Sequence, residues 1–244
     1  MKRSFVFIIC LIPINTIKIF LLRLLGCKVH KKAKIGLSII FVGELNLAEY
    51  SSIGSFNLIM VDKLSMEKNT SIKKLNFIRG PFDLILQSCS GISSQNKIRR
   101  AIPPVTYGKA SLILGINSFI VSNHFIDLTR SVTIGCHSII AGIRTQIWTH
   151  GYYHESTGKG RIRIDGPVRI GDNVYVGSSC IFNPGVSVSD NIHIGAGSTI
   201  SKNLSEPGMY VGQSLRFINN SIEKIRAKLN KIQCEGLIEE VYSK

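Results

Sequence analysis

IGDNVY-VGSSCI-FNPGVS-VSDNIH-IGAGST-ISKNL, residues 170–204, is a run of six-residue blocks. Each block opens with an apolar residue: Ile170, Val176, Phe182, Val188, Ile194 and Ile200. A period of six matches neither the turn of an α-helix nor the alternation of a simple strand. It predicts a solenoid of very short strands joined by turns, with three blocks in each coil and the opening residues stacked inward. Glycine, asparagine and aspartate suit the left-handed backbone conformations of such turns.

These blocks resemble the hexapeptide-repeat acyltransferases, a family whose repeats coil into a left-handed parallel β-helix. The handedness is implied by this resemblance and not by the spacing, because the general crossover rule favours the right-handed form. The expected fold class is therefore all-β, a left-handed parallel β-helix with an N-terminal and a C-terminal helix. Repeats alone leave open a β-solenoid that catalyses nothing and only presents a binding surface.

The six-residue spacing extends over most of the chain and defines the expected domains. Further residues in step with it are Ile35, Phe41, Leu47, Ile53, Ile59, Ile72, Ile78, Leu84, Leu114, Ile120, Ile126, Ile134 and Ile140. Residues 95–110 and 151–167 interrupt it and are expected to be loops, which in solenoids often lie on the binding face. We expect a helical segment over 1–30, a β-helix catalytic domain over 31–206, and a C-terminal helix and tail over 207–244.

The first 30 residues have a basic start and two interrupted apolar runs. A membrane-spanning helix needs about 20 apolar residues, and a signal peptide needs a small-residue cleavage site; neither is evident. The pattern predicts an amphipathic helix from Asn15, its N-cap, with Lys18 and Arg23 turned to water or lipid headgroups. The next lysines are Lys28, Lys31, Lys32 and Lys34. They suit anionic lipid, although the helix could instead only cap the solenoid.

A second amphipathic pattern follows the repeats. Apolar residues recur at alternating steps of three and four: Leu215, Ile218, Ile222, Ile225, Leu229 and Ile232. Such spacing forms one apolar helix face. The pattern predicts a C-terminal helix that packs on its own chain or on a partner.

The composition favours an anionic partner in a reducing compartment. The net charge is +15 and the isoelectric point is about 9.7, which suits membrane phosphates or a phosphorylated substrate. No helix-turn-helix, zinc-finger or RNA-binding motif accompanies the charge, so we expect no nucleic-acid partner. The six cysteines are scattered without zinc-like or disulfide-framework spacing. We therefore expect a cytoplasmic protein, peripheral at the inner face of the membrane where the N-terminus binds lipid.

The richest candidate for chemistry is IWTHGYYHESTGKGR, residues 147–161. His150 lies where the repeats give way to a loop, and a half-exposed imidazole there suits a general base. The resemblance to the sugar O-acetyltransferase branch of the family extends to this segment. It implies that His150 is the catalytic histidine and that His154 is a substrate-side residue. Either Asp127 or Glu155 could orient His150 through its second ring nitrogen.

The resemblance implies direct acyl transfer, in which His150 takes the proton of a sugar hydroxyl that attacks the thioester of acetyl-CoA. The family binds CoA in a groove between subunits of a homotrimer. Carried over by position, Ser178 would contact the thioester end, Ala196 the pantetheine, and Ser201 and Lys202 the later part of the chain. Arg216 would face the nucleotide phosphates, a role that suits a basic side chain.

The acceptor side is predicted from SNHFID, residues 122–127. Its polar residues Asn123, His124 and Asp127 interrupt an apolar ladder, which suggests a cleft, although a purely structural role is also open.

These features lead to an acetyl-CoA-dependent O-acetyltransferase that modifies a nucleotide- or lipid-linked sugar in bacterial surface polysaccharide synthesis. One alternative is a metalloenzyme similar to γ-class carbonic anhydrases, with His150, His154 and His193 as ligands. Their separations do not fit the coil, so no metal site is expected. A non-catalytic binding solenoid is the other alternative.

Overall fold

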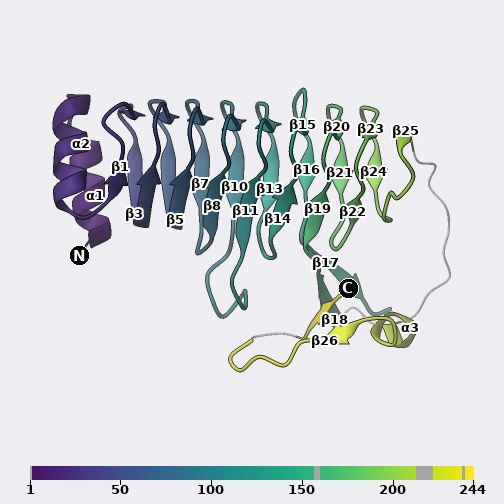
Figure 1. The fold of residues 1–244 in the computed structure, drawn as a ribbon. Helices are drawn as coiled ribbons and strands as arrows, with labels where there is room; N and C mark the ends of the chain where they lie inside the picture. The colour runs from purple at the N-terminus through teal and green to yellow at the C-terminus, as the bar shows by residue number, and fades with distance from the viewer. Residues whose placement is uncertain (1, 157–159, 213–221, 238–239) are drawn as a thin grey trace.

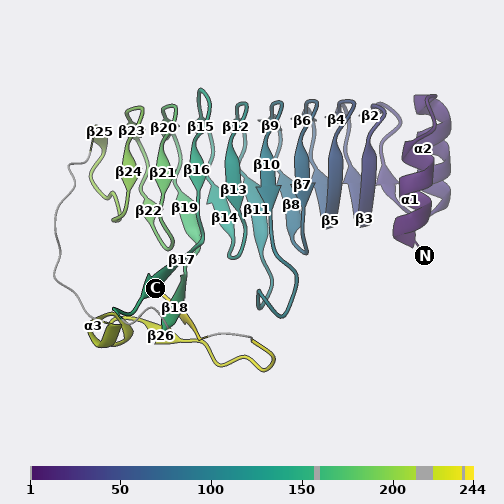
Figure 2. The ribbon, with the colours of Figure 1, turned by 180° about the vertical axis from the view of Figure 1, so that it is seen from behind.

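The computed structural model describes residues 2–156, 160–212, 222–237 and 240–244, and these form a left-handed parallel β-helix. Two helices, α1 (Lys2–Cys10) and α2 (Asn15–Leu24), cover its N-terminal end, as Figures 1 and 2 show from opposite sides. The coils stack from these helices toward the last strand, β25 (Gly208–Tyr210), with parallel hydrogen bonds between neighbouring coils. The predicted fold class is confirmed.

The β-helix is a prism with three faces. Each face is a parallel sheet to which successive coils contribute one strand each. The first face is nine-stranded: β2 (Lys34–Ile35), β4 (Ser52–Ile53), β6 (Ser71–Ile72), β9 (Gly91–Ile92), β12 (Phe119–Ile120), β15 (Ile139–Ile140), β20 (Tyr175–Val176), β23 (Ile192–Ile194) and β25. The second comprises the first halves of β3 (Ile39–Leu47) and β5 (Leu58–Met66), then β7 (Phe77–Arg79), β10 (Lys97–Arg99), β13 (Phe125–Asp127), β16 (Gln146–Ile147), β21 (Ile181–Phe182) and β24 (Thr199–Ile200). The third comprises β1 (Lys28–Val29), the second halves of β3 and β5, then β8 (Asp83–Leu86), β11 (Ser111–Leu114), β14 (Val132–Ile134), β19 (Val168–Ile170) and β22 (Ser187–Val188).

The core is the stack of inward side chains that the six-residue spacing predicts. All six residues that open the blocks of 170–204 are buried. One prediction in the first coil is wrong, because Ile40 is buried and Phe41 is not. Ile40 pairs with Ile59 of the next coil, and Phe41 pairs with Met60. The turn between Ile35 and Ile39 is one residue shorter than the equivalent turn between Ile53 and Leu58, so the inward position moves from Phe41 to Ile40.

A polar ladder runs through one corner of the prism beside this core. The backbone N–H of each coil donates to a side chain of the preceding coil, from Asn76 to Asn57 at 2.9 Å and from Asn96 to Asn76 at 2.9 Å. His124 continues it, because its N–H donates to Asn96 Oδ1 at 3.0 Å and its Nδ1 accepts the Thr145 N–H at 3.1 Å. The ladder satisfies backbone donors that would otherwise be buried without partners.

The predicted N-terminal helix is present, but its polar residues have different roles. Ile14 is the N-cap and Asn15 begins the helix, where its side chain bonds to Ala33 O and the Ile35 N–H. Lys18 is only 1% exposed and donates to the carbonyls of Ile35 and Gly36 at 2.8 and 3.0 Å. We expected Lys18 to lie in water or among headgroups, and this prediction is wrong. Lys18 instead caps the first coil, because two backbone carbonyls take the place of water as acceptors for its ammonium. Arg23 is exposed, as predicted.

Two segments, here called excursions, leave the regular coil between the second and the third face, and both project from the same side of the prism, as Figure 1 shows. The first follows β10, so the predicted loop over 95–110 begins only after Arg99. The second, predicted as a loop over 151–167, is an antiparallel hairpin of β17 (His150–His154) and β18 (Arg161–Asp165). Cross-strand pairing with no six-residue period explains why the repeat pattern fails there.

The C-terminal residues pack against this hairpin. Strand β27 (Val241–Ser243) pairs with β18 and with β26 (Asn230–Lys231), and α3 (Ile222–Arg226) lies beside them. The helix predicted over 215–232 therefore ends earlier, at Arg226, because Asn230 and Lys231 form backbone hydrogen bonds with β27 instead of continuing the helix. Leu215 and Ile218 lie outside the described residues. Ile225 and Leu229 pack on a small cluster of Ile162 and Tyr242, so this segment contacts its own chain.

Candidate active site

The hairpin, the excursion after β10 and the second face of the prism enclose a cavity of about 280 Å³. Its lining residues come from three successive coils and from both excursions: Arg99, Ala101, Val105, Phe125, Asp127, Thr129, Trp148, His150, Tyr152 and Arg163. The cavity is thus built where the regular coil is interrupted twice on one side, and His150 lies in its wall.

Asp127 holds His150 by a short hydrogen bond. Asp127 ends β13, and His150 begins the hairpin one coil later, so the two meet although they are distant in sequence. His150 Nδ1 is 2.9 Å from Asp127 Oδ2, and the His150 side chain is 26% exposed. No described residue hydrogen-bonds its Nε2. The imidazole is therefore fixed at one nitrogen and available at the other.

Two threonines fix the Asp127 carboxylate in turn. The Thr149 N–H and hydroxyl donate to Oδ2 at 3.1 and 2.6 Å. The Thr129 hydroxyl donates to Oδ1 at 3.1 Å and also lies 3.1 Å from His150 Nδ1. These donors and the histidine N–H favour the ionised carboxylate. Asp127 is thus held in one orientation before any ligand binds.

The pKa values of this pair move in opposite directions. For Asp127, burial alone would raise the pKa, but the hydrogen bond and charge of His150 lower it below its usual value. For His150, burial alone would lower the pKa, but the hydrogen bond and charge of Asp127 raise it. Because Asp127 accepts the Nδ1–H, we assign the neutral imidazole the tautomer with its lone pair on Nε2. That nitrogen can accept a proton from a ligand.

A buried ion pair in β18 shapes the opposite wall. Arg163 Nε donates to Asp165 Oδ1 at 2.9 Å, and their side chains are 2% and 0% exposed. Arg163 Nη1 also donates to the Val105 carbonyl at 2.6 Å, which ties the hairpin to the excursion after β10. Burial raises the pKa of Asp165 despite the opposing effect of Arg163. Asp165 pairs with His150 across the hairpin and adds negative potential near the imidazole.

A strip of aromatic rings leads out of the cavity. Phe125 and Trp148 have ring centroids 4.7 Å apart, Trp148 and His150 5.9 Å, and His150 and Tyr152 6.0 Å. Tyr152 then contacts the His154 ring at 6.4 Å. Aromatic faces offer apolar area with polar tips, a surface on which the C–H face of a sugar ring can pack.

The structure places the predicted acceptor-binding residues in different surroundings. Asp127 lines the cavity, and the exposed His154 lies at the outer end of the aromatic strip. Asn123 is an exposed turn residue with φ of 60°, away from the lining. His124 is 2% exposed inside the ladder, and burial lowers its pKa to about 4. His124 therefore supports the coil and does not face a ligand, contrary to our expectation.

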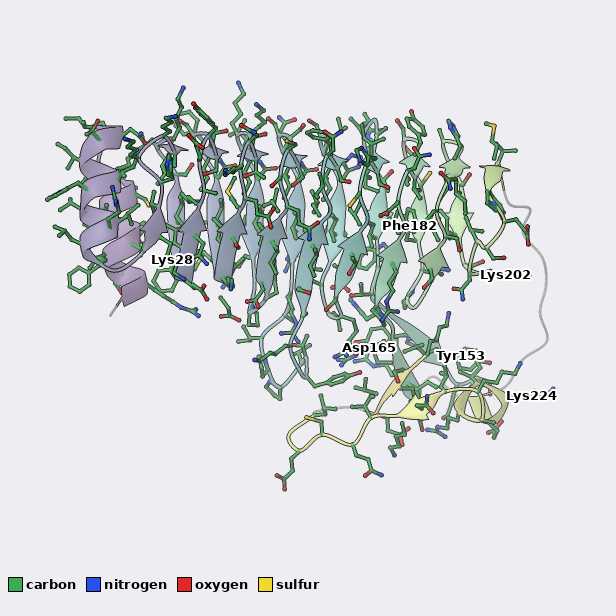
Figure 3. All side chains as sticks on the ribbon, viewed as in Figure 1. Lys28, Tyr153, Asp165, Phe182, Lys202 and Lys224 are labelled. Atoms are coloured by element: carbon green, nitrogen blue, oxygen red, sulfur yellow. The ribbon has the colours of Figure 1, made fainter. Side chains whose placement is uncertain are left out.

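The residues predicted to bind CoA lie on later coils, outside this cavity. Ser178 and Ala196 occupy equivalent turns of successive coils, so close that a Cβ on Gly177 would be 2.6 Å from the Ala196 nitrogen. Ser178 Oγ accepts the Ile143 N–H at 3.3 Å. Ser201 and Lys202 are exposed after β24, and Figure 3 shows Lys202 on the last coils, apart from Asp165 on the hairpin. Arg216 lies outside the described residues.

Of the lining residues, the sequence-based prediction included only Asp127 and His150; among those that it missed are Thr129, Trp148 and Arg163, and it also missed Thr149, which holds Asp127. The signal available was proximity, since Thr149 and Trp148 immediately precede His150 and Thr129 follows Asp127 by two positions. Glu155, the other candidate for orienting His150, has no contact with it among the described residues. No three side chains of the described residues cluster as metal ligands, and His193 instead stacks on Tyr175 with ring centroids 4.5 Å apart.

Known proteins resemble part of this chain. The family described as the hexapeptide repeat of succinyl-transferase matches residues 167–202. Galactoside O-acetyltransferase of Escherichia coli (strain K12) is 35% identical over 118 residues, which cover 48% of this chain and 58% of that protein. A putative acetyltransferase, YvoF, of Bacillus subtilis (strain 168) is 32% identical over 107 residues, which cover 43% and 57%. The matches thus span a little over half the length of these relatives.

Solved structures of similar shape include the polySia-specific acetyltransferase NeuO, with 19% identity and a TM-score of 0.45 over 72% of this chain and 78% of that one. A maltose O-acetyltransferase from Clostridium difficile 630 has 26% identity and a TM-score of 0.42 over 56% and 70%. At these TM-scores neither likeness bears on function. The six-residue coils, the matched repeat family and the named relatives make this chain similar to the hexapeptide-repeat acyltransferases over part of its length.

Proposed function

We propose that this protein transfers an acetyl group from acetyl-CoA to a sugar hydroxyl, with His150 as general base. The observation that carries the proposal is the His150–Asp127 pair, because both residues line a cavity of about 280 Å³ and only Nδ1 of His150 is held by the carboxylate. The relatives named as O-acetyltransferases support the same chemistry. Acetyl-CoA is a substrate here, and no nucleophilic side chain of the protein is required.

The proposed reaction has one transfer step. Nε2 of His150 takes the proton of the acceptor hydroxyl as its oxygen attacks the thioester carbonyl. The new C–O bond forms, the C–S bond breaks, and the proton passes from the imidazolium to the departing CoA sulfur. Asp127 stabilises the positive charge that develops on His150, and a positioned base of this kind typically contributes about 10²–10⁴-fold.

The acceptor would lie against the aromatic strip. Trp148 and Tyr152 flank His150 and offer ring faces, while Arg99 supplies donors at the cavity wall. We propose nucleotide- or lipid-linked sugars of bacterial surface polysaccharides as acceptors. Diphosphate groups of such acceptors suit the exposed Arg79 and Arg99, which lie side by side on neighbouring coils.

The donor would bind along the last coils. Ser178, Ala196, Ser201 and Lys202 are our proposed contacts for CoA, together with Arg216. Because these positions lie outside the His150 cavity of the same chain, the proposal includes a homotrimer in which the donor groove of one subunit adjoins the cavity of its neighbour. The predicted oligomer can be measured by light scattering on the purified protein.

The test is acetyl transfer from labelled acetyl-CoA to a panel of nucleotide sugars and lipid-linked oligosaccharides. The wild type is compared with His150→Ala and with His193→Ala, a histidine on another face of the prism, as matched control. We expect transfer to one class of acceptor, lost in His150→Ala and kept in His193→Ala, with acetyl-CoA binding preserved in both. Absence of transfer to every acceptor, or full activity of His150→Ala, would contradict the proposal.

A further inference from the structure

The two N-terminal helices expose apolar side chains on the face turned away from the coils. In α2, Ile19 and Leu22 are buried against the first coil, whereas Phe20 and Leu24 are 62% and 69% exposed. The same division recurs in α1, where the buried Val6 lies beside Phe5, which is 52% exposed. Other large exposed apolar residues of this end are Ile8, Leu11, Ile14 and Ile17.

A helix that is apolar on both faces is normally covered on both. Here the coils cover only one face of each helix, and Figure 3 shows side chains projecting from the helices away from the prism. Exposed apolar patches on this scale mark a surface for a protein partner or a membrane. No helix among the described residues is long and apolar enough to cross a bilayer. The exposed face would therefore lie on a membrane surface and not across it.

The N-terminal part of the chain that carries this apolar face is strongly basic. Residues 1–43 contain no aspartate or glutamate. The described ion pairs join Arg3 to Asp62 and Lys32 to Glu49, and none involves Arg23, Lys28, Lys31 or Lys34. These four cations are thus available to an external anion.

A groove of about 490 Å³ combines the two features. It runs along α2, and its lining combines the apolar residues Ile19, Phe20 and Leu24 with the cations Arg23 and Lys31 and with the polar residues Asn15 and Thr16. A lining that combines apolar residues with cations matches the acyl chain and phosphate of an anionic phospholipid. A second copy of the chain fits poorly, because end-to-end packing would bring two sets of unpaired cations together.

We propose that the exposed face of α1 and α2, with Arg23, Lys28, Lys31 and Lys34, binds the surface of an anionic lipid membrane. The apolar residues enter the headgroup boundary and the cations contact lipid phosphates. The prism then stands with its catalytic cavity several coils from the bilayer, at the cytoplasmic leaflet where anionic lipids are concentrated. This inference stands apart from the acetyl-transfer proposal, since it uses no residue of the cavity.

The experiment is flotation of the full chain with vesicles of phosphatidylcholine alone and of phosphatidylcholine mixed with phosphatidylglycerol. The apolar variant is Phe20→Glu with Leu24→Glu, and the charge variant is Lys31→Gln with Lys34→Gln. Met209→Glu with Val211→Glu is the matched control, because these residues are 66% and 65% exposed at the opposite end of the prism. Circular dichroism checks that all variants are folded.

We expect binding to the anionic vesicles and little to the neutral ones, weakening as salt is added. The apolar variant should bind at least tenfold more weakly, and the charge variant about fivefold more weakly for each lysine removed. The control should bind like the wild type. No flotation of the wild type, equal binding to both vesicle types, or equal loss in the control would overturn the proposal. So would light scattering that shows the apolar variant abolishing an end-to-end dimer while vesicle binding is absent.

Discussion

Replacing Asp127 with asparagine tests how the carboxylate acts on His150. The change removes the charge that lies 2.9 Å from His150 Nδ1 while keeping the size of the side chain. A hydrogen bond to a charged group is worth about 1.5–3 kcal/mol, or roughly 10–150-fold in rate when it is needed in the transition state. We therefore expect kcat/KM for acetyl transfer to fall about 10²-fold at its optimum pH.

The pH profile gives a more specific signature. In the wild type, Asp127 raises the pKa of His150 above 6.5 against the effect of burial. Without the carboxylate, the lowering effect of burial remains and the pKa of His150 falls. Since the base must be neutral, activity rises with pH through this pKa, and the acidic limb should move to lower pH in Asp127→Asn. A limb that stays in place or moves upward, or a loss of less than about threefold, would refute this account of the pair.

The same pair predicts how stability depends on pH. The lowered pKa of Asp127 contributes stability above pH 3.8 that is lost as pH falls through the folded value. The raised pKa of His150 contributes stability below pH 6.5 that is lost as pH rises through the folded value. The difference in unfolding free energy between wild type and Asp127→Asn should thus be largest between pH 3.8 and 6.5, measured by urea denaturation. Asp62→Asn, at a 43% exposed acid, is the control.

Three further predictions concern the ladder, Arg163 and the aromatic strip. His124→Ala should destabilise the fold by about 1–3 kcal/mol, whereas His124→Asn should largely keep its stability because Asn96 already holds that position one coil earlier. Urea denaturation distinguishes the two variants. A loss of acceptor binding at full stability would instead indicate that His124 contacts the ligand. Arg163→Met should leave the Asp165 carboxylate buried without its partner, which should lower the free energy of unfolding by about 3–5 kcal/mol. It should also speed proteolysis near Val105, because Arg163 no longer ties the hairpin to that segment. Unchanged proteolysis would contradict this role of Arg163. Trp148→Ala should raise KM for the sugar at least several-fold with little change in KM for acetyl-CoA, and the opposite split in initial-rate kinetics would place the donor on the aromatic strip.

The coils were predictable because the inward positions obey a strict local rule. Ile170 and the block openings after it are buried as the six-residue spacing requires. Phe41 broke the rule because the turn before β3 is one residue shorter than the turn of the next coil, a difference that the six-residue spacing does not reveal. The sequence pattern placed Lys18 on the polar face of an amphipathic helix. Its burial could not be predicted, because the two backbone carbonyls that accept from its ammonium belong to another segment of the chain.

The site was only partly predictable. His150 stood out because the repeats stop there, and Asp127 and Glu155 were equal candidates for its partner. The coil between Asp127 and His150 is longer than three six-residue blocks, since Phe125 pairs with Gln146, so the repeat spacing does not reveal that the two residues meet. Burial decides the role of His124, which the sequence shows only as a polar residue in an apolar ladder.

The most direct test of the central claim is the rate of acetyl transfer by wild type and His150→Ala, at saturating acetyl-CoA and above the pKa of His150. The account predicts a fall in kcat of about 10²–10⁴-fold with the dissociation constant for acetyl-CoA unchanged. A His150→Ala enzyme within about fivefold of the wild type would contradict the assignment of Nε2 as the base.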